Sequence, residues 1–584
     1  YRGPRSGFRL MSSLRSDTRA LKHQMSLLIQ RIMPATPPAT LALVHALIDA
    51  LDAQHSHILL TPEQVQALDT PAHKALIGSP GDQSPLVQLD NRLYLRRLFN
   101  LEKRVAQQLF ARNRQVNPAS DTAPKHQNET SGVDALSVSQ QAAVATALNR
   151  QLTIISGGPG TGKTTVIRSI VSALKHLDPN LRIAITAPTG KATARLEDSF
   201  RQDLRADLGP EIKTIHRLLG YGAGNRPRFN QMRRLPTDVL IADEASMIDL
   251  SLADALFSAL PDTARLILVG DPDQLPSVNL GRLLTDITPR NATARPPLMP
   301  TLDNATARPL MPVLASAQCR LTENFRFTEG ASIHELAEAL LAGQVTPPDA
   351  GDRIKTIAPK ALTDTLLRSA FSDYFSALAK CASVQDLLKA FESVRLLAPR
   401  YQGPLGVHDL NAKIEQLMQK LGLLKRLRSA HYHGQPILIL KNDYQLELYN
   451  GDVGLCLDTQ QLNQADPDRD EDARGLIAFF NTGPDAQPRR FAMNALPEHE
   501  TCFAMTVHKA QGSEFDQVLF VLADALDDAT QRTGSRELIY TGITRAKRQL
   551  TLVTTPESWH RASNNVLNRR SGLALQLQLL ETAL

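Results

Sequence analysis

Residues 156–165 read SGGPGTGKTT, and this stretch decides the fold. Gly157, Gly162, Lys163 and Thr164 stand in GxxxxGK[ST] spacing, after a short apolar run and before a segment with helical periodicity. A glycine-rich turn at such a junction lets backbone N–H groups close around phosphate oxygens, and the helix N-terminus adds the positive end of its dipole. The lysine can bring a point charge to the outer phosphates, and the threonine hydroxyl can bind Mg²⁺. The stretch therefore predicts a P-loop for ATP and Mg²⁺. The residues expected to hold the nucleotide are Gly157, Gly158, Pro159, Gly160, Thr161, Gly162, Lys163, Thr164 and Thr165.

Short apolar runs alternate with helical segments on both sides of this loop. Strands that are buried on both faces of a parallel sheet have such near-continuous apolar runs. The alternation predicts an α/β fold with two lobes, at residues 136–345 and 346–584. The runs lie at residues 152–156, 181–187, 239–243 and 264–270 in the first lobe and at 394–398, 518–522 and 549–553 in the second.

Two other regions have different patterns. Apolar residues recur at three- and four-residue spacing from about 20 to 112, and residues 113–135 are rich in Asn, Ser, Pro and Gly. We therefore expect residues 1–135 to form a helical N-terminal domain with a linker. Residues 431–497 hold short β-rich pieces and turn signals, and they predict a small β-barrel or sheet inserted in the second lobe.

Composition sets broad limits. Of the 584 residues, 42% are hydrophobic and 21% are charged, which argues against wholesale disorder. The net charge of +6 is a mild basic excess and fits an anionic partner without identifying one. No apolar run reaches the roughly 18–20 residues of a membrane span. The cysteines form no CxxC pair, so we expect free thiols and a cytoplasmic protein. They are Cys319, Cys381, Cys456 and Cys502.

Two short segments stand apart from these regions. The first 31 residues are basic, with Asp17 as their one acid. They are either an arm that touches nucleic acid or, as we favour, an extension upstream of a misplaced start. NATARPPLMP at 291–300 returns as NATARPLMP at 304–312, and a single short duplication predicts a surface insertion rather than a solenoid.

Acidic and amide residues follow two of the predicted strands. Asp243 ends the run VLIAD, and Glu244 comes next. Ligands of open α/β sheets bind at the carboxyl ends of strands, so we expect Asp243 to hold Mg²⁺ through water. Glu244 is suited to orient and deprotonate an attacking water. Gln274 follows the strand that ends in Gly270, and its neutral amide can contact a γ-phosphate.

With these elements placed, the chain resembles superfamily 1 helicases that move 5′→3′. The matching stretches, in order, are LSVSQQAAV (136–144), APTGKATARL (187–196), TIHRLLG (214–220), DEAS (243–246), GDPDQLPSV (270–278), LTENFRF (321–327), TVHKAQGSEFD (506–516) and LIYTGITRAKRQL (538–550). The resemblance implies two RecA-like P-loop lobes. It also implies that Gln140 reads the adenine, that Arg326 reaches the γ-phosphate, and that Arg545 is an arginine finger from the second lobe. The residues that it implies for DNA contact are Pro188, Thr189, His216, Thr506 and His508.

Further stretches are similar to one family within that superfamily, the RecD subunits of helicase–nuclease complexes (exodeoxyribonuclease V). They are residues 91–106, which resemble a partner-docking region, and 396–411, 449–454 and 496–516. The resemblance implies an ATP-dependent DNA motor that acts at double-strand ends in recombinational repair, with RecB-like and RecC-like partners. The nuclease site would belong to the beta subunit. The sequence departs from the usual pattern at Ala510 and Gly542.

Three alternatives stay open. A standalone RecD-like 5′→3′ helicase shares the motor, although that group carries a longer N-terminal region with helix–hairpin–helix elements. A nucleotide-gated scaffold that binds DNA without translocating is disfavoured by the presence of Glu244 and Arg545. An RNA helicase is disfavoured by the family resemblance alone.

Overall fold

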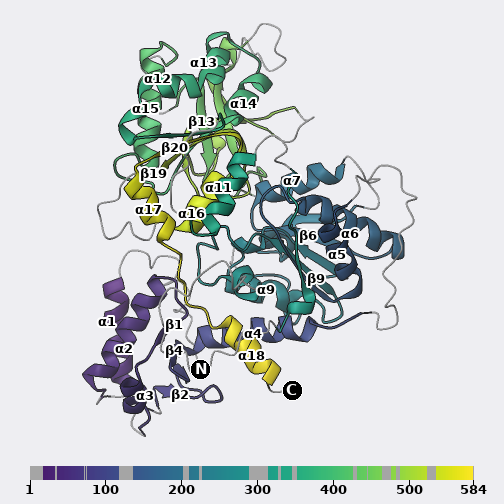
Figure 1. Cartoon of the computed structure of the whole chain (residues 1–584), viewed down its shortest axis with the longest axis vertical. Coiled ribbons are helices and arrows are strands. Elements are labelled where there is room, and N and C mark those ends of the chain that lie inside the picture. The colour runs from purple at the N-terminus through teal and green to yellow at the C-terminus, as the bar shows by residue number, and fades with distance from the viewer. Residues whose placement is uncertain are drawn as a thin grey trace.

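The computed structural model describes most of the chain, and Figure 1 shows an N-terminal body, a first lobe and a second lobe. The predictions for residues 1–10, for the repeat at 291–312 and for Arg326 fall outside the described residues. Within the described ranges, no helix is both long and apolar enough to cross a membrane. Those ranges are 18–32, 34, 36–70, 73, 75–116, 136–201, 209–222, 226–288, 313–325, 331–344, 352–424, 431–443, 445–462, 475–481, 487–522 and 534–582.

The first lobe is built on a six-stranded parallel sheet, as the apolar runs predicted. Its strand order is β10-β5-β9-β8-β6-β7. Helices α5, α6 and α7 cover one face, and α8, α9 and α10 cover the other, which is why the central strands are buried on both sides. The elements are α5 (Val138–Asn149), β5 (Leu152–Ser156), α6 (Lys163–Leu177), β6 (Ile183–Ala187), α7 (Gly190–Arg201), β7 (Glu211–Thr214), α8 (Ile215–Leu218), β8 (Val239–Ala242), α9 (Leu250–Ala259), β9 (Arg265–Gly270), α10 (Leu283–Ile287) and β10 (Gln318–Arg320).

The second lobe also has a parallel sheet, with the order β11-β20-β19-β12-β18. Helices α12 to α15 pack on one face, and α11, α16 and α17 pack on the other. The predicted α/β fold with two parallel sheets is therefore confirmed. The elements are α11 (Ala331–Leu341), β11 (Ile354–Ile357), α12 (Asp364–Ala370), α13 (Ser372–Ala379), α14 (Val384–Glu392), β12 (Val394–Ala398), α15 (Val407–Lys420), β18 (Ala504–Thr506), β19 (Phe515–Leu522), α16 (Arg536–Ile543), β20 (Ala546–Thr554) and α17 (Pro556–Asn564), and α18 (Leu573–Thr582) follows them.

An antiparallel sheet is inserted in the second lobe between α15 and β18, where β-rich pieces were predicted. Its order is β16-β15-β14-β13-β17. No pairing between β16 and β17 closes it among the described residues, so of the two predicted forms, a small barrel or a sheet, the described part is an open sheet. The strands are β13 (Gln435–Ile439), β14 (Val453–Asp458), β15 (Leu476–Phe480), β16 (Arg489–Ala492) and β17 (His499–Thr501).

The N-terminal body is not purely helical, which corrects the sequence prediction. A four-stranded sheet of order β1-β4-β3-β2 lies between its second and fourth helices. The strands are two to four residues long, and apolar residues at helical spacing concealed them. Asp90, with φ +51°, lies between the paired β3 and β4. The elements are α1 (Thr18–Ile32), α2 (Pro38–Asp52), β1 (His57–Leu59), α3 (Pro62–Leu68), β2 (Ile77–Gly78), β3 (Leu86–Leu89), β4 (Arg92–Leu95) and α4 (Arg96–Arg112).

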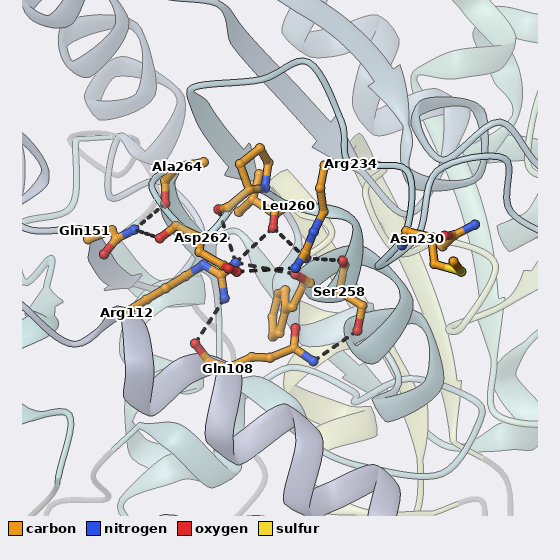
Figure 2. Close-up of polar contacts among 12 residues, drawn as sticks. Gln108, Arg112, Gln151, Asn230, Arg234, Ser258, Leu260, Asp262 and Ala264 are labelled. Atoms are coloured by element: carbon orange, nitrogen blue, oxygen red, sulfur yellow. Dashed lines mark hydrogen bonds and ion pairs between the residues drawn. The ribbon is translucent and has the colours of Figure 1, made fainter.

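Helix α4 attaches the N-terminal body to the first lobe. Arg112 donates from Nη2 to the carbonyl oxygen of Leu260 at 3.1 Å, and Arg234 donates to the same oxygen at 3.1 Å (Figure 2). This oxygen follows the C-terminal end of α9, where unpaired carbonyls favour cations. Earlier on α4, Arg104 pairs with Asp254 of α9 at 2.7 Å. The two helices are therefore joined at several points along their length.

The C-terminal strap, residues 565–572, runs from the second lobe to the N-terminal body. The strap is followed by α18, which packs beside α4 (Figure 1). The backbone N–H of Gly572 donates to Oε1 of Glu102 at 2.9 Å, and Glu102 is fully buried on α4. Arg569 donates to the carbonyl oxygen of Ser277 in the first lobe at 2.6 Å. The backbone N–H of Leu567 donates to Oε2 of Glu537 in the second lobe at 2.9 Å, so the strap contacts all three bodies.

Candidate functional site

A cavity of about 430 Å³ lies between the two lobes. Residues that follow β5, β8 and β9 line it from the first lobe, and residues near β19 and β20 line it from the second. The sites of open α/β sheets lie at this edge. The predicted site residues in the lining are Pro159, Gly160, Gly162, Lys163, Thr164, Asp243, Glu244, Gln274 and Arg545.

The P-loop turns between β5 and α6. Gly160 and Gly162 have φ angles of +82° and +77°, which glycine adopts without strain. Lys163 Nζ donates to the carbonyl oxygens of Gly157 and Gly158, each at 2.8 Å. Helix α6 begins at Lys163, so its free N–H groups lie where the loop ends. Four of the P-loop residues predicted to hold the nucleotide are outside the cavity lining: Gly157, Gly158, Thr161 and Thr165.

Gln140 contacts the P-loop but is not in the cavity lining. Its Nε2 donates to the carbonyl oxygen of Thr161 at 3.1 Å, and its Oε1 accepts from the backbone N–H of Ser137 at 3.1 Å. The second contact belongs to the capping box of α5. A side chain at Gly162 would place its Cβ 2.4 Å from Nε2 of Gln140. Gln140 therefore supports the P-loop in the structure, and adenine contact stays a prediction.

Asp243 and Glu244 follow β8 at the floor of the cavity. The backbone N–H of Glu244 donates to Oδ1 of Asp243 at 2.8 Å. Burial, followed by the neighbouring charge of Glu244, raises the pKa of Asp243 above its ordinary value. Glu244 has φ +51° and ψ +41°, a left-handed conformation that costs a residue with a Cβ about 1–3 kcal/mol and is frequent at functional sites.

Gln274 reaches the cavity from the loop after β9. It is 4% exposed, and its Nε2 donates to Oδ2 of Asp271 at 3.0 Å. An amide nitrogen carries two hydrogens, so one remains for a phosphate oxygen. Asp271 is also buried, and its Oδ1 accepts from the backbone N–H of Asp273 at 3.1 Å. Among the described residues, the side-chain amide of Gln274 is thus held by Asp271 alone.

Arg545 enters the same cavity from the second lobe, directly after α16. Its guanidinium donates to the carbonyl oxygens of Thr541 (3.0 Å) and Ser513 (3.2 Å) and to Oγ1 of Thr544 (3.4 Å). The residue is 2% exposed, and burial lowers the pKa of Arg545 from its ordinary value while Glu514 opposes that shift. The structure therefore brings together an arginine from one lobe and the P-loop lysine of the other.

Several lining residues were missed by the sequence analysis. Arg195 of α7 and Glu514 of the second lobe form an ion pair across the lobes at 3.5 Å. Phe325 lines the cavity, and its backbone N–H donates to the carbonyl oxygen of Gly160 at 2.9 Å. The helical spacing of Ala192, Arg195 and Leu196 could have revealed that α7 presents one face to the cavity. The missed lining residues are Ala192, Arg195, Leu196, Phe325, Gly512 and Glu514.

Two of the residues predicted to contact DNA follow β6 beside the cavity. Thr189 accepts a hydrogen bond through Oγ1 from the backbone N–H of Ala192 at 3.2 Å, and Pro188 precedes it. In the second lobe, Thr506 ends β18. A Cβ at Gly512 would lie 3.8 Å from Oγ1 of Thr189. The stretches 187–196 and 506–516, which carry predicted DNA contacts, therefore approach each other at Thr189 and Gly512.

The two histidines predicted to contact DNA are half-buried, His216 in the short helix α8 and His508 in the turn after β18. Burial lowers the pKa of His216, and burial together with Arg569 lowers the pKa of His508. Both rings are therefore mainly neutral at pH 7. They would contact a nucleic acid as hydrogen-bonding or stacking groups rather than as cations.

The inserted sheet touches the first lobe at this edge as well. Tyr449, between β13 and β14, accepts a hydrogen bond through its hydroxyl from Nη1 of Arg217 at 2.7 Å. Its ring lies on Gly190, where a Cβ would come within 2.6 Å of the ring. The insertion therefore covers the start of α7, directly after Thr189.

Comparison with known proteins places these features in a family. Residues 140–280 match the AAA domain, and residues 501–553 match the UvrD-like helicase C-terminal domain. The RecBCD enzyme subunit RecD of Haemophilus influenzae is 33% identical over 496 residues, which are 75% of this chain and 72% of that protein.

Two further relatives extend the match. The RecBCD enzyme subunit RecD of Mycobacterium tuberculosis is 34% identical over 84% of this chain and 80% of its own length. The ATP-dependent RecD2 DNA helicase of Deinococcus radiodurans is 28% identical over 88% of this chain and 63% of its own length. On identity and coverage together, the chain belongs to the RecD family of RecBCD enzyme subunits.

Proposed function

We propose that this chain is an ATP-dependent 5′→3′ single-stranded DNA translocase and helicase. It would be the motor subunit of a RecBCD-type complex with RecB-like and RecC-like subunits, acting at double-strand DNA ends in the cytoplasm. The observation that carries the proposal is the cavity between the lobes, which Lys163 and Arg545 line together. The proposed role is that of the motor alone, with nuclease activity assigned to another subunit.

The first lobe would bind ATP. The turn at 157–165 and the start of α6 supply N–H groups to the phosphates, and Lys163 adds its charge. Gln274 would contact the γ-phosphate with its second amide hydrogen. The family resemblance assigns the same task to Arg326. Glu244 would orient the attacking water from its left-handed position at the end of β8.

Thr164 and Asp243 are the residues that would hold Mg²⁺. Both line the cavity, and both offer the oxygen ligands that this ion prefers. Burial and the neighbouring carboxylate of Glu244 raise the pKa of Asp243, and the charge of a divalent cation would offset both effects. The bound ion would neutralise charge on the phosphate oxygens during hydrolysis.

Arg545 would complete the site from the second lobe. Its guanidinium is already oriented by three oxygen acceptors, so little reorganisation is needed when negative charge develops on the γ-phosphate. Because it belongs to the other lobe, hydrolysis depends on closure of the cleft. Release of phosphate would allow reopening, and a strand held by both lobes would advance with each cycle.

The strand would run past Pro188, Thr189 and His216 of the first lobe and past Thr506 and His508 of the second. The proximity of Thr189 to Gly512 supports a track that spans both lobes. Hydroxyl and backbone contacts to phosphates position a strand without reading its sequence. Affinity should fall as salt rises.

We also propose the boundaries of the three units. The sequence predicts residues 1–135 as the partner-docking unit and 136–345 and 346–584 as the two motor lobes. Helix α11 (Ala331–Leu341) packs against α16 and shares the core of the second sheet. This packing favours moving the start of the second lobe to a position before α11.

The decisive experiment measures DNA-stimulated ATP hydrolysis and strand separation on duplexes with either a 5′ or a 3′ overhang. The wild type should unwind the 5′-overhang substrate. Glu244→Gln should bind nucleotide but neither hydrolyse it nor unwind DNA. Unwinding that begins from the 3′ overhang, or hydrolysis that is unaffected in Glu244→Gln, would contradict the proposal.

The similarity to RecD2 favours one alternative, a standalone helicase. Purification with RecB-like and RecC-like subunits distinguishes the two hypotheses. A stable complex whose unwinding exceeds that of the isolated chain supports the subunit role, whereas full activity without any association supports the standalone one.

A further inference from the structure

A tyrosine of the second lobe contacts the acid that holds Gln274. Tyr540 lies on α16 and is 3% exposed. Its hydroxyl donates to Oδ2 of Asp271 at 3.1 Å. The same Oδ2 accepts from Nε2 of Gln274 at 3.0 Å. One carboxylate oxygen in the first lobe therefore links the cavity-lining amide to a hydroxyl of the opposite lobe.

Two more hydrogen bonds tie this loop to the second lobe. The backbone N–H of Leu275 donates to Oγ1 of Thr541 at 2.8 Å, and its carbonyl oxygen accepts from Nε2 of Gln511 at 2.8 Å. Thr541 is next to Tyr540 on α16. The loop after β9 therefore belongs to the first lobe by chain connection but is held in place by side chains of the second.

The Tyr540 hydroxyl also lies close to the P-loop. A Cβ built on Gly158 would lie 3.1 Å from the Tyr540 hydroxyl, and among the described residues no other atom beyond Gly158 and its two chain neighbours lies within 4 Å of that position. The carbonyl oxygen of Gly158 accepts from Nζ of Lys163 at 2.8 Å. The hydroxyl thus lies between the loop that carries Gln274 and the turn that carries Lys163.

We propose that Tyr540 is a positioning residue for ATP hydrolysis. Through Asp271 it would fix the amide of Gln274 at the γ-phosphate only while α16 is seated on the first lobe. Closure of the cleft would then have two effects on the site. It would bring in Arg545, and it would align Gln274. The inference rests on the proposed function, because it concerns the same reaction.

The protonation states suit this role. Burial, with Asp271 next, raises the pKa of Tyr540 well above its ordinary value, so the hydroxyl keeps its proton and donates. Burial also raises the pKa of Asp271, while Lys163 lowers it. Phenylalanine at position 540 would keep the ring and its packing in the core but would lack the hydroxyl donor.

The test compares Tyr540→Phe with the wild type in DNA-stimulated hydrolysis. Loss of one hydrogen bond to a buried carboxylate should lower kcat about tenfold. The KM for ATP should change less than about twofold, because the P-loop contacts to the nucleotide remain. In a Gln274→Ala background the same substitution should cost less than about twofold, since the group that Tyr540 positions is already gone.

Tyr374→Phe is the matched control. Tyr374 is a fully buried tyrosine of the same lobe, and its hydroxyl donates to the carbonyl oxygen of Gly434 at 2.6 Å, outside the cavity lining. It should lose thermal stability and keep its kcat. If Tyr540→Phe does not fold, Asp271→Asn takes its place. The introduced amide has one acceptor oxygen where the carboxylate has two, so it cannot serve all the donors around this position without rearrangement. The same dependence on Gln274 is expected of this variant.

Three results would overturn parts of this scheme. A wild type without DNA-stimulated hydrolysis would remove the proposed function and this inference with it. An active wild type matched by Tyr540→Phe would remove the inference alone. A tenfold loss that is equally large in the Gln274→Ala background would show that Tyr540 does not act through Gln274.

Discussion

Replacement of Arg545 by lysine tests the cross-lobe site most directly. Lysine keeps the positive charge but lacks the planar fork of donors. In the structure, that fork contacts Thr541, Ser513 and Thr544 at 3.0, 3.2 and 3.4 Å. A lysine ammonium can keep only some of these contacts, and it would not present a fixed donor to the γ-phosphate.

The size of the effect follows from this preorganisation. Arg545 is 2% exposed, so its interaction with developing charge takes place away from bulk water. Removal of one preorganised donor of this kind lowers kcat by about 10²–10³, or about 2.7–4 kcal/mol in the barrier. Nucleotide affinity should change by less than about threefold, because Lys163 and the P-loop belong to the other lobe.

The assay is steady-state ATP hydrolysis with saturating single-stranded DNA, together with binding of a fluorescent ADP analogue and thermal unfolding. Arg536→Lys is the control. Arg536 is also on α16 and buried, and it donates to the carbonyl oxygen of Ser563 at 2.8 Å without lining the cavity. If Arg545→Lys folds normally and keeps more than half of the wild-type turnover, Arg545 is not the group that stabilises the transition state.

Three further perturbations give separate outcomes. Lys163→Gln should lower DNA-stimulated hydrolysis by at least about 100-fold with an unchanged melting temperature, and undiminished hydrolysis would overturn the P-loop assignment. Burial raises the pKa of Glu102 to about 7, so folding loses up to about 3 kcal/mol as pH rises from about 4.5 to about 7. The melting temperature of Glu102→Gln minus that of the wild type should therefore be more positive at pH 8 than at pH 5. An equal difference at both pH values would contradict this reasoning. Gly190→Ala would place a Cβ 2.6 Å from the ring of Tyr449, so it should destabilise the protein by about 1–3 kcal/mol and alter DNA affinity. Gly222→Ala is its control, because no atom of the described residues lies within 4 Å of a Cβ there, and equal melting temperatures for the two variants would show that the insertion does not pack against Gly190.

The motor lobes could be predicted because their signals are local. Each central strand is a run of apolar residues that is buried on both faces, and β5 at Leu152–Ser156 and β12 at Val394–Ala398 have the predicted bounds. The strands of the N-terminal body lacked such a signal. Leu86–Leu89 and Arg92–Leu95 are four residues each, and their leucines also fit helical spacing.

The site was predictable only where its residues belong to one linear motif. Lys163 and Thr164 follow from the spacing of the P-loop. The pairing of Arg195 with Glu514 depends on how two lobes pack, and no local pattern contains that information. The glycine at position 542, where the sequence departs from the usual family pattern, also depends on packing. A Cβ there would lie 3.1 Å from the ring of Phe520 on β19.

The C-terminal strap has a consequence for synthesis of the chain on the ribosome. Glu102 and Gly572 are 470 residues apart. At about 5–20 residues per second, the ribosome therefore adds Gly572, whose N–H donates to Glu102, roughly 20–90 s after it has made Glu102 of α4. During that interval the nascent N-terminal body exposes the surface that α18 later covers. Nascent chains stalled before residue 572 should be cut by protease within α4, whereas chains that extend beyond α18 should resist.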